Sequence, residues 1–297
     1  MNTAALWRRD VPLADRTTWR VGGPADFLFA PETPEQAAAA YAEARSKGID
    51  VLVLGRGSNV VIADAGFRGL VLALSERMTA AALETDPESG ALVLRARAGA
   101  KLAALAASAV KAGGAGMEKL AGIPGSLGGA VLMNAGAYGA ETAAIVRKVV
   151  VCDAEGRLSE FPAGECGFGY RESRFKGSDA LILEVECRCE PGDPAELRRV
   201  MEEHLAMRRE KQPLSLPNAG SLFKRPEGDF AGRLVEAAGL KGFRVGDAAI
   251  SEKHAGFAVN LGRATAADVR KLAEEVQRRV FEHSGVRLET EQIFVGF

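Results

Sequence analysis

The apolar and polar positions of the first 75 residues alternate between strand-like and helical periods. Residues 26–29 predict a short strand, and Thr33 followed by Pro34 predicts the capped start of a helix that Gly48 ends. Apolar runs predict further strands at 51–54, 60–62 and 70–74. We therefore expect a small α/β unit over residues 1–75.

A second segment of mixed character covers residues 76–190. Leu92, Leu94 and Ala96 alternate with less apolar neighbours, which predicts a strand. A helix is expected over 101–112, because two glycines follow it, and strands are expected at 149–152 and 181–189. Between them lies the densest glycine run of the chain, residues 122–139.

The character of the chain changes near Pro191, where we place the boundary of a third domain, residues 191–297. Asp193 and Pro194 predict the start of a helix, and Thr265 predicts the cap of another that Gly285 follows. The apolar positions of these helices recur on one face. They are Leu197, Val200, Met201 and Leu205 in the first helix and Val269, Leu272, Ala273, Val276 and Val280 in the second.

A terminal strand is predicted over residues 286–295, and its apolar parity switches along its length. Val286 and Leu288 are apolar at even positions, whereas Ile293 and Val295 are apolar at odd positions. Glu291 shares the side of the second pair, so its carboxylate is expected to be partly buried. A surface strand with a bulge explains the same pattern, and both interpretations stay open here.

Composition and charge narrow the class of protein. The chain has 297 residues, 47% hydrophobic and 26% charged, which excludes a disordered chain. Its 38 Lys and Arg residues face 39 Asp and Glu residues, so no overall field draws it toward nucleic acid or an anionic membrane. Its 34 glycines are more than usual and favour tight turns or close approach to a ligand. We expect a small-molecule enzyme.

Its location is expected to be cytoplasmic. Arg8, Arg9 and Asp10 stand where a signal peptide would be apolar, and no apolar run approaches the roughly 20 residues that span a bilayer. The 4 cysteines are too few for a disulfide scaffold and are expected to be buried thiols.

Two glycine-rich segments are the first candidates for chemistry. The first glycine loop, residues 55–59, follows an apolar run, but Val60 replaces the third glycine of a dinucleotide fingerprint. It is either a phosphate-cradling loop or an ordinary turn. The second glycine stretch, residues 122–139, is apolar and almost uncharged. It suits either a planar cofactor lying against backbone or a tightly packed crossing between domains.

A few polar residues of the second half are the remaining candidates. Arg171 precedes a predicted strand, Ser221 lies in a loop of small residues, and Lys211 and Lys241 are available to bind anions or to solvate a surface. The three histidines, His204, His254 and His283, are scattered, so we expect no metal site. No Ser-His-Asp set or Walker A motif is evident.

Taken together, these motifs resemble one family, the UDP-N-acetylenolpyruvoylglucosamine reductases, from about residue 17 onward. The chain is similar to the shorter subtype, because residues 181–193 leave no room for an extra substrate-covering loop. The matching segments are residues 19–25, 54–59, 121–126, 134–139, 170–173, 220–224, 240–242 and 288–291.

The resemblance implies an α+β fold with FAD and NADPH as cofactors. Residues 1–75 and 76–190 would form a two-part α/β FAD-binding module of the vanillyl-alcohol-oxidase (PCMH) type, and residues 191–297 a smaller α+β substrate-binding domain. Lys211 and Lys241 would bind the diphosphate of a UDP-sugar. FAD would contact Gly55, Arg56, Gly57, Ser58, Asn59, Ile123, Pro124, Gly125, Ser126, Gly128, Gly129, Asn134, Gly136, Ala137 and Tyr138.

The implied reaction reduces the enolpyruvyl ether of UDP-N-acetylglucosamine-enolpyruvate, and it implies three catalytic residues. Hydride adds to an electron-rich enol ether only if charge is drawn into the attached carboxylate. Arg171, with Glu291, would stabilise that charge, and Ser221 would donate the proton as general acid.

Two positions depart from the family pattern. Arg225 stands where Asn is usual and Ala249 where Gln is frequent, which affects the expected contacts to the nucleotide. The alternatives are an FAD-linked oxidase of an alcohol or sugar acid, or a UDP-sugar-binding regulatory protein without redox activity. We expect a monomer without nucleic-acid or membrane partners.

Overall fold

The computed structural model describes residues 3–297, and the chain divides into two compact units. Each unit combines segments that are far apart in the sequence. Unit 1 contains residues 3–9, Phe27–Arg56 and Gly69–Met207, and unit 2 contains Asp10–Asp26, Gly57–Arg68 and Arg208–Phe297. The three-part division at residues 75 and 190 stays a prediction.

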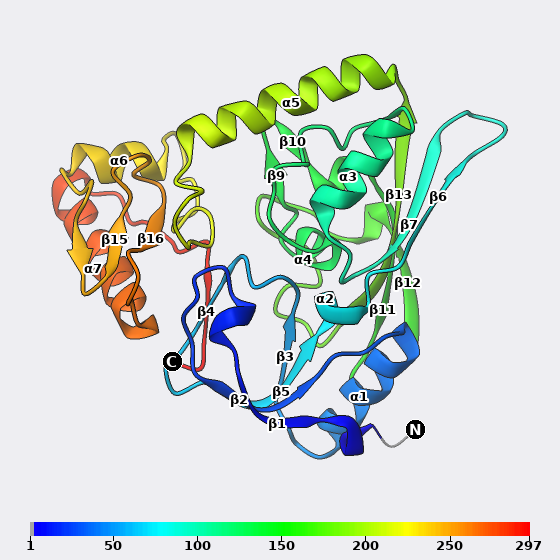
Figure 1. The fold of residues 1–297 in the computed structure, drawn as a ribbon, viewed down its shortest axis with the longest axis horizontal. Helices are drawn as coiled ribbons and strands as arrows, with labels where there is room; N and C mark the ends of the chain where they lie inside the picture. The colour runs from blue at the N-terminus through cyan, green and yellow to red at the C-terminus, as the bar shows by residue number, and fades with distance from the viewer. Residues whose placement is uncertain (1–2) are drawn as a thin grey trace. The chain divides into compact units, whose positions relative to one another are not determined.

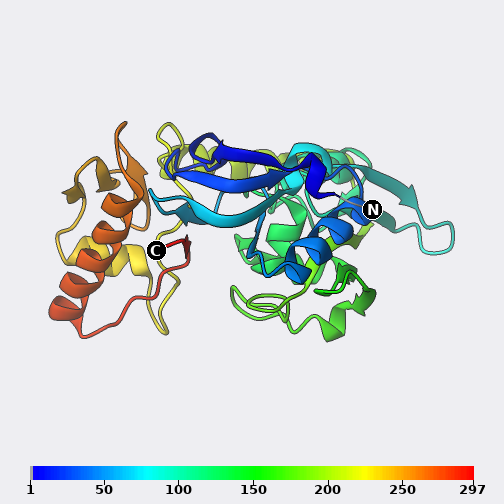
Figure 2. The ribbon, with the colours of Figure 1, turned by 90° about the horizontal axis from the view of Figure 1, so that it is seen from below.

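Unit 1 is built on an antiparallel 6-stranded sheet (Figure 1). Its order is β12 (Leu158–Pro162), β11 (Val146–Cys152), β13 (Leu181–Pro191), β7 (Leu92–Arg97) and β6 (Ala81–Thr85), and β8 (Gly114–Ala115) also pairs with β13. The turn between β6 and β7 projects away from the rest of unit 1 (Figures 1 and 2).

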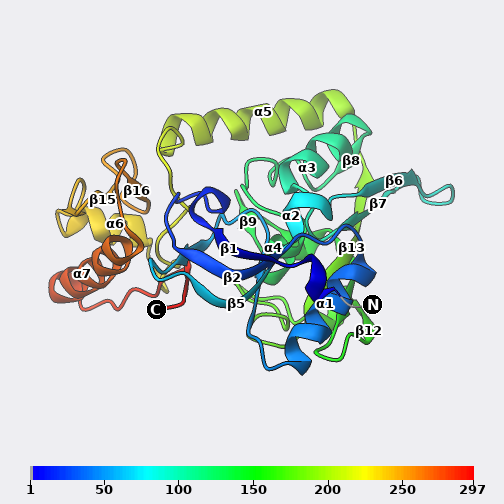
Figure 3. The same cartoon turned by 60° about the horizontal axis from the view of Figure 1, so that its bottom comes forward.

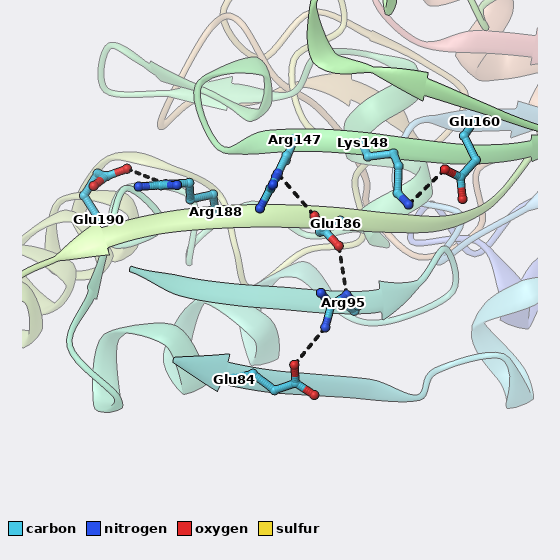
Figure 4. Close-up of polar contacts among 8 residues, drawn as sticks. All are labelled: Glu84, Arg95, Arg147, Lys148, Glu160, Glu186, Arg188 and Glu190. Atoms are coloured by element: carbon cyan, nitrogen blue, oxygen red, sulfur yellow. Dashed lines mark hydrogen bonds and ion pairs between the residues drawn. The ribbon is translucent and has the colours of Figure 1, made fainter. Parts of the chain in front are cut away.

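The two faces of this sheet differ because side chains alternate along each strand. In β13, Val185 and Cys187 are buried in the core of unit 1, whereas Glu186 points to the opposite face. There it lies 2.8 Å from Arg95, which also pairs with Glu84 (Figure 4). This opposite face is therefore a charged surface, and its exposed ion pairs contribute little stability.

The helices α1 (Pro34–Ser46) and α3 (Leu102–Lys111) of unit 1 lie where the sequence predicts them, whereas α2 (Leu74–Arg77) and α4 (Leu127–Leu132) were not predicted. Thr33 Oγ1 accepts the Gln36 N–H at 3.3 Å at the start of α1, and Gly48 follows with a φ of 67°. The helices α3 and α4 also contribute buried residues to the core.

The four cysteines are buried free thiols, as predicted. Burial raises the pKa of the Cys152 thiol to about 12 and that of Cys187 further still, so neither forms a thiolate near neutral pH.

A second, 4-stranded sheet has the order β1 (Arg8–Pro12), β2 (Pro24–Phe29), β5 (Phe67–Ala73) and β3 (Val51–Leu54). β3 and β5 run parallel, with Val51 opposite Leu70. The predicted strands at 26–29, 51–54 and 70–74 are therefore present. The first glycine loop begins where β3 ends.

Unit 2 packs two helices with a small antiparallel sheet (Figure 3). The sheet has the order β14 (Arg244–Val245), β15 (Ala248–Ile250) and β16 (Ala258–Asn260), and the helices are α6 (Ala231–Ala237) and α7 (Ala266–Ser284). Thr265 and Asp268 form a reciprocal capping box, and the Asp64 carboxylate accepts the N–H groups of Ala266 and Ala267 at 2.8 and 2.9 Å. The Thr265 hydroxyl and the carboxylates of Asp268 and Asp64 thus accept hydrogen bonds from the backbone N–H groups at the start of α7.

The predicted terminal strand over 286–295 is wrong in extent. The observed strand, β17 (Ile293–Val295), pairs in parallel with β4 (Val60–Ile62). Before it, Glu291 N–H donates to Leu222 O at 2.9 Å, whereas Ile293 N–H donates to Asn59 O at 3.0 Å. The backbone changes its hydrogen-bonding partner between residues 291 and 293, and this change accounts for the switch of parity.

The helix α5 (Pro194–Lys211) begins where predicted, with the Ala195 N–H donating to Asp193 Oδ1 at 3.1 Å. Of its predicted apolar face, Leu197 is buried, while Val200 and Leu205 are half-exposed. In the described part of the chain, no helix has the length and apolar character needed to cross a membrane.

Candidate active site

The two glycine-rich segments meet within unit 1. A Cβ at Gly55 would lie 2.3 Å from Ser126 Oγ, a distance that no real side chain tolerates. Ser126 is 4% exposed and its hydroxyl accepts the Gly129 N–H at 3.3 Å at the start of α4. The end of the first glycine loop nearest β3 therefore lies directly against the second glycine stretch, and a side chain at position 55 fits only if the Ser126 hydroxyl moves from its place as the cap of α4.

Other glycines of these segments accommodate neighbouring protein atoms. A Cβ at Gly57 would lie 2.1 Å from the Arg16 carbonyl oxygen, one at Gly128 would lie 2.7 Å from Ala98 Cβ, and one at Gly136 would lie 2.6 Å from a carbonyl oxygen. Tight packing of the chain accounts for these three positions without any ligand.

The residues at the start of α4 are partly exposed, unlike the tightly packed glycines Gly57, Gly128 and Gly136. Pro124 and Gly129 are exposed, and Ile123 and Gly125 are half-exposed. The nearest atom to a Cβ at Gly129 is Ser126 Oγ, at 3.3 Å. This part of unit 1 exposes backbone and small side chains without charge, which suits a flat, uncharged ring system.

Asn134 acts as a clamp between the second glycine stretch and the segment that carries Arg171. Its side chain is 1% exposed, and Nδ2 donates to Gly169 O at 2.9 Å and to Glu141 at 3.0 Å. Oδ1 accepts the Ala143 N–H at 2.9 Å. The whole amide is therefore engaged by the protein itself, although the sequence predicts Asn134 as a cofactor contact.

Arg171 lies beside the second glycine stretch in a strained backbone conformation. Its φ is 57°, a region that non-glycine residues rarely adopt. Nη2 donates to Gly136 O at 3.4 Å, and the guanidinium carbon lies 4.9 Å from the centre of the Tyr170 ring. Lys176 Nζ donates to the Arg171 carbonyl at 3.1 Å. These contacts hold the half-buried guanidinium next to the predicted cofactor surface of unit 1.

Tyr138 is the exposed aromatic residue of the second glycine stretch. It is 38% exposed, has a φ of 53°, and its ring centre lies 4.5 Å from that of His204 on α5. His204 Nδ1 lies 2.7 Å from Val200 O, so the imidazole is anchored to its own helix.

Ser221 and Glu291 come together within unit 2. The Leu222 N–H donates to Gly256 O at 3.0 Å and Leu222 O accepts the Glu291 N–H, so the segment that carries Glu291 lies against the Ser221 loop, residues 218–224. Asn59 Nδ2 donates to Glu291 O at 3.1 Å. The far end of the first glycine loop is thus joined to the same cluster, in which Ser221 and Glu291 are half-buried.

Sequence reasoning missed Gln292 in this cluster. It is 2% exposed, and its side-chain amide forms hydrogen bonds with Trp19 and with the Ser221 loop. A signal was present, because Gln292 has the even parity of apolar Val286 and Leu288 and is therefore a polar residue on an apolar side.

The two predicted diphosphate ligands, Lys211 and Lys241, are both residues of unit 2. Lys241 Nζ pairs with Glu236 at 2.7 Å, and burial lowers the pKa of the neighbouring His254. Lys211 is exposed at the end of α5. Of the two departing positions, Arg225 stacks on a phenylalanine ring and Ala249 is buried in β15.

Comparisons with known proteins decide the family. A model described as "FAD binding domain" matches residues 25–161, and one for the UDP-N-acetylenolpyruvoylglucosamine reductase C-terminal domain matches 212–295. The UDP-N-acetylenolpyruvoylglucosamine reductase of Heliobacterium modesticaldum is 44% identical over 291 residues, 98% of this chain and 91% of the relative. UDP-N-acetylenolpyruvoylglucosamine reductase 2 of Symbiobacterium thermophilum is 45% identical over 284 residues, which are 96% of this chain and 90% of the relative. The chain belongs to the UDP-N-acetylenolpyruvoylglucosamine reductase family.

A solved structure supports the same family and confirms the fold class. The UDP-N-acetylenolpyruvylglucosamine reductase of Thermus caldophilus matches with a TM-score of 0.81 and 36% identity, over 97% of this chain and 99% of that chain. The predicted α+β fold, with a PCMH-type FAD-binding module and a C-terminal domain, is therefore confirmed. Within this reductase family member, Gly55, Ser126 and Gly136 lie in the FAD-binding match, and Ser221, Lys241 and Glu291 in the C-terminal match.

Proposed function

We propose that this chain is an NADPH-dependent flavoenzyme that reduces the enolpyruvyl ether of UDP-N-acetylglucosamine-enolpyruvate to UDP-N-acetylmuramate, a step of peptidoglycan precursor synthesis. The observation that carries the proposal is sequence identity of 44% and 45% to two reductases over nearly the whole chain. The joining of Ser221 and Glu291 through Leu222 supports it from the structure.

FAD fits the uncharged backbone that Pro124 and Gly129 expose at the start of α4. When bound, FAD accepts hydride from NADPH and supplies it to the enolpyruvyl group. Residues 55–59 would hold its pyrophosphate through backbone N–H groups and the Ser58 and Asn59 side chains. Residues 123–125 and Gly129 provide the flat surface for its ring system.

Arg171 binds the substrate carboxylate and stabilises the charge that develops there. A planar guanidinium grips a carboxylate through two hydrogen bonds and keeps its own charge throughout. Its fixed position beside Gly136 makes this electrostatic stabilisation preorganised, so no reorganisation is needed during the reaction.

Ser221 donates the proton that completes the reduction. Its Oγ–H donates its proton to the carbon next to the carboxylate. A weak acid is sufficient here, because a carbanion-like centre is basic enough to take its proton. Glu291 lies on the segment bonded to the Ser221 loop. Its proposed role is to help stabilise the charge that develops on the substrate carboxylate.

Lys211 and Lys241 bind the diphosphate of the UDP-sugar as charge-assisted donors. The ion pair between Lys241 and Glu236 is partly exposed to solvent and therefore weak enough to be exchanged for a phosphate. The protein works as a cytoplasmic monomer.

The deciding experiment follows both halves of the reaction without oxygen. Purified protein should be yellow, NADPH should bleach the flavin absorbance, and UDP-N-acetylglucosamine-enolpyruvate should restore it with formation of UDP-N-acetylmuramate. Flavin that is bleached by an alcohol or sugar acid and restored only by oxygen would favour the oxidase instead. A colourless protein that binds UDP-sugars would favour the regulatory protein.

A further inference from the structure

A buried amide connects the two catalytic segments of unit 2. Gln292 is 2% exposed, and Trp19 Nε1–H donates to its Oε1 at 2.8 Å. Its Nε2 donates to Ala219 O at 3.2 Å and lies 3.4 Å from the carbonyl oxygens of Gly220 and Ser221. Three successive carbonyl groups of the Ser221 loop therefore converge on one amino group.

The backbone on either side of Gln292 is also held in place. The preceding residue, Glu291, donates its N–H to Leu222 O, and the following residue, Ile293, donates its N–H to Asn59 O. Gln292 thus lies between two residues whose backbone N–H groups bond different segments. Its side chain bonds the Ser221 loop, which the Glu291 backbone also contacts. A shift of Gln292 would move Ser221 and Glu291 together.

Trp19 determines which way this amide faces. The indole N–H is a donor only, so it selects the carbonyl oxygen of Gln292 and leaves the amino group for the loop. Trp19 is 0% exposed, and Asn260 Nδ2 donates to its carbonyl oxygen at 3.0 Å. Because the tryptophan is fixed at both its backbone and its ring, the amide has one orientation.

We propose that Gln292 is a positioning residue that sets the place of Ser221 and Glu291 for proton donation to the substrate. The inference rests on the proposed function, because those two residues are catalytic only in that reaction. Gln292 itself touches neither substrate nor cofactor, since its amide is consumed by Trp19 and the loop.

The first test replaces Gln292 by Leu, which removes the amide and keeps similar volume. Substrate-driven reoxidation of the flavin should slow about 10- to 100-fold, mostly in kcat, because small displacements of reacting groups have effects of this size. Reduction by NADPH should stay within about twofold. The solvent deuterium isotope effect on reoxidation should rise, because proton donation becomes the slow step.

A second variant, Gln292→Glu, adds a pH-dependent readout. The carboxylic acid still accepts from Trp19 and, when protonated, still donates to the loop, but the ionised form faces three carbonyl oxygens without a proton. Its reoxidation rate should therefore approach that of the parent at low pH and fall as pH rises. Gln292→Leu should show the same relative loss at every pH.

A matched control separates positioning from stability. Thr265→Ala removes the cap of α7 in the same unit and leaves Trp19, Gln292 and the Ser221 loop unchanged, so it should lower the melting temperature without slowing reoxidation. The double variant Trp19→Phe/Gln292→Leu should lose less stability than the sum of its two single variants, because each single variant leaves one partner of the Trp19–Gln292 hydrogen bond unsatisfied and the double variant removes both. It should nevertheless stay slow in reoxidation.

Hydrogen exchange of the resting protein supplies a readout that needs no turnover. In Gln292→Leu, the amides of Leu222 and Glu291 should exchange faster relative to those of α7. Unchanged exchange at these amides, or a parental rate of reoxidation in Gln292→Leu, would overturn the positioning role. If substrate cannot reoxidise the parental protein, the proposed function fails, and the catalytic role of Gln292 fails with it. Exchange that still rises at Leu222 and Glu291 would then identify the proposed function as the part that failed.

Discussion

The hydroxyl of Ser126 lies where a side chain at Gly55 would have to be, 2.3 Å from the position of its Cβ. This contact joins the first glycine loop to the start of α4 within unit 1. The two segments predicted to hold FAD are therefore in direct contact at this pair of residues.

Gly55→Ala should displace Ser126 and weaken FAD binding. The added methyl group collides with Ser126 Oγ, so either the loop or the cap of α4 must shift, and we expect a loss of about 1–3 kcal/mol in stability, as for other overpacked sites. Flavin content after gel filtration and the melting temperature measure the effect. Gly55→Ala/Ser126→Gly should recover part of both, because glycine is an adequate N-cap and removes the collision. A double variant as poor as the single one would argue against the contact as the cause.

FAD should be bound without a covalent link. Residues 55–59 and 122–139 contain no His or Cys to which flavin could be attached. Denaturation followed by precipitation should release all of the yellow colour into the supernatant. Flavin that remains with the precipitated chain would refute the prediction.

Arg171→Lys should impair the half-reaction with substrate much more than the half-reaction with NADPH. Lysine keeps the charge but loses the planar pair of donors that grips a carboxylate. Stopped-flow absorbance measures flavin reoxidation and flavin reduction separately. Arg174→Lys is a matched control, because Arg174 belongs to the same segment but stacks on Phe161 at 4.2 Å. Equal losses in both half-reactions would mean that Arg171 supports the flavin site instead.

Ser221→Ala should lower turnover by about 10²- to 10⁴-fold, the usual effect of losing a general acid. FAD content and flavin reduction by NADPH should be unchanged, because neither requires the hydroxyl. Ser221→Cys should recover part of the loss, since a thiol with a pKa of about 8.5 is a competent acid of similar size. Reoxidation of Ser221→Ala by substrate at the parental rate would leave the loop with a structural role only.

Stability should fall in acid partly through Glu43. Its carboxylate pairs with Lys47 Nζ at 2.7 Å and accepts from the Thr3 hydroxyl and N–H groups and the Ala4 N–H, which lowers the pKa of Glu43 to about 2. Because the pKa is lower in the folded protein, the stabilisation is fully present above about pH 5 and is lost as pH falls toward 2.

The matching variant is Glu43→Gln. It should be about 1 kcal/mol less stable than the parent at pH 7, a small value because the pair is near the surface. The difference should shrink as pH approaches 2. Denaturant unfolding at a series of pH values measures it, and a difference that does not vary with pH would exclude the ionised carboxylate as its source.

The sequence by itself determined the features that depend on near neighbours in the chain. Thr33 and Thr265 begin α1 and α7 because a cap acts within three or four residues, and Gly48 and Gly285 follow them because the left-handed turn is a property of one residue. The order of the motifs identified the family for the same reason, since each motif is a short run of residues.

Only the tertiary structure decided which distant segments share a unit and a site. Residues 57–68 join residues 208–297 because β4 pairs with β17, and no local periodicity encodes a partner more than 200 residues away. The predicted terminal strand, residues 286–295, was too long. Its change of parity reflects a change of hydrogen-bonding partner, which the sequence alone does not show. Gln292 was missed because a buried amide is stable only with partners that meet it in space, here Trp19 and the Ser221 loop.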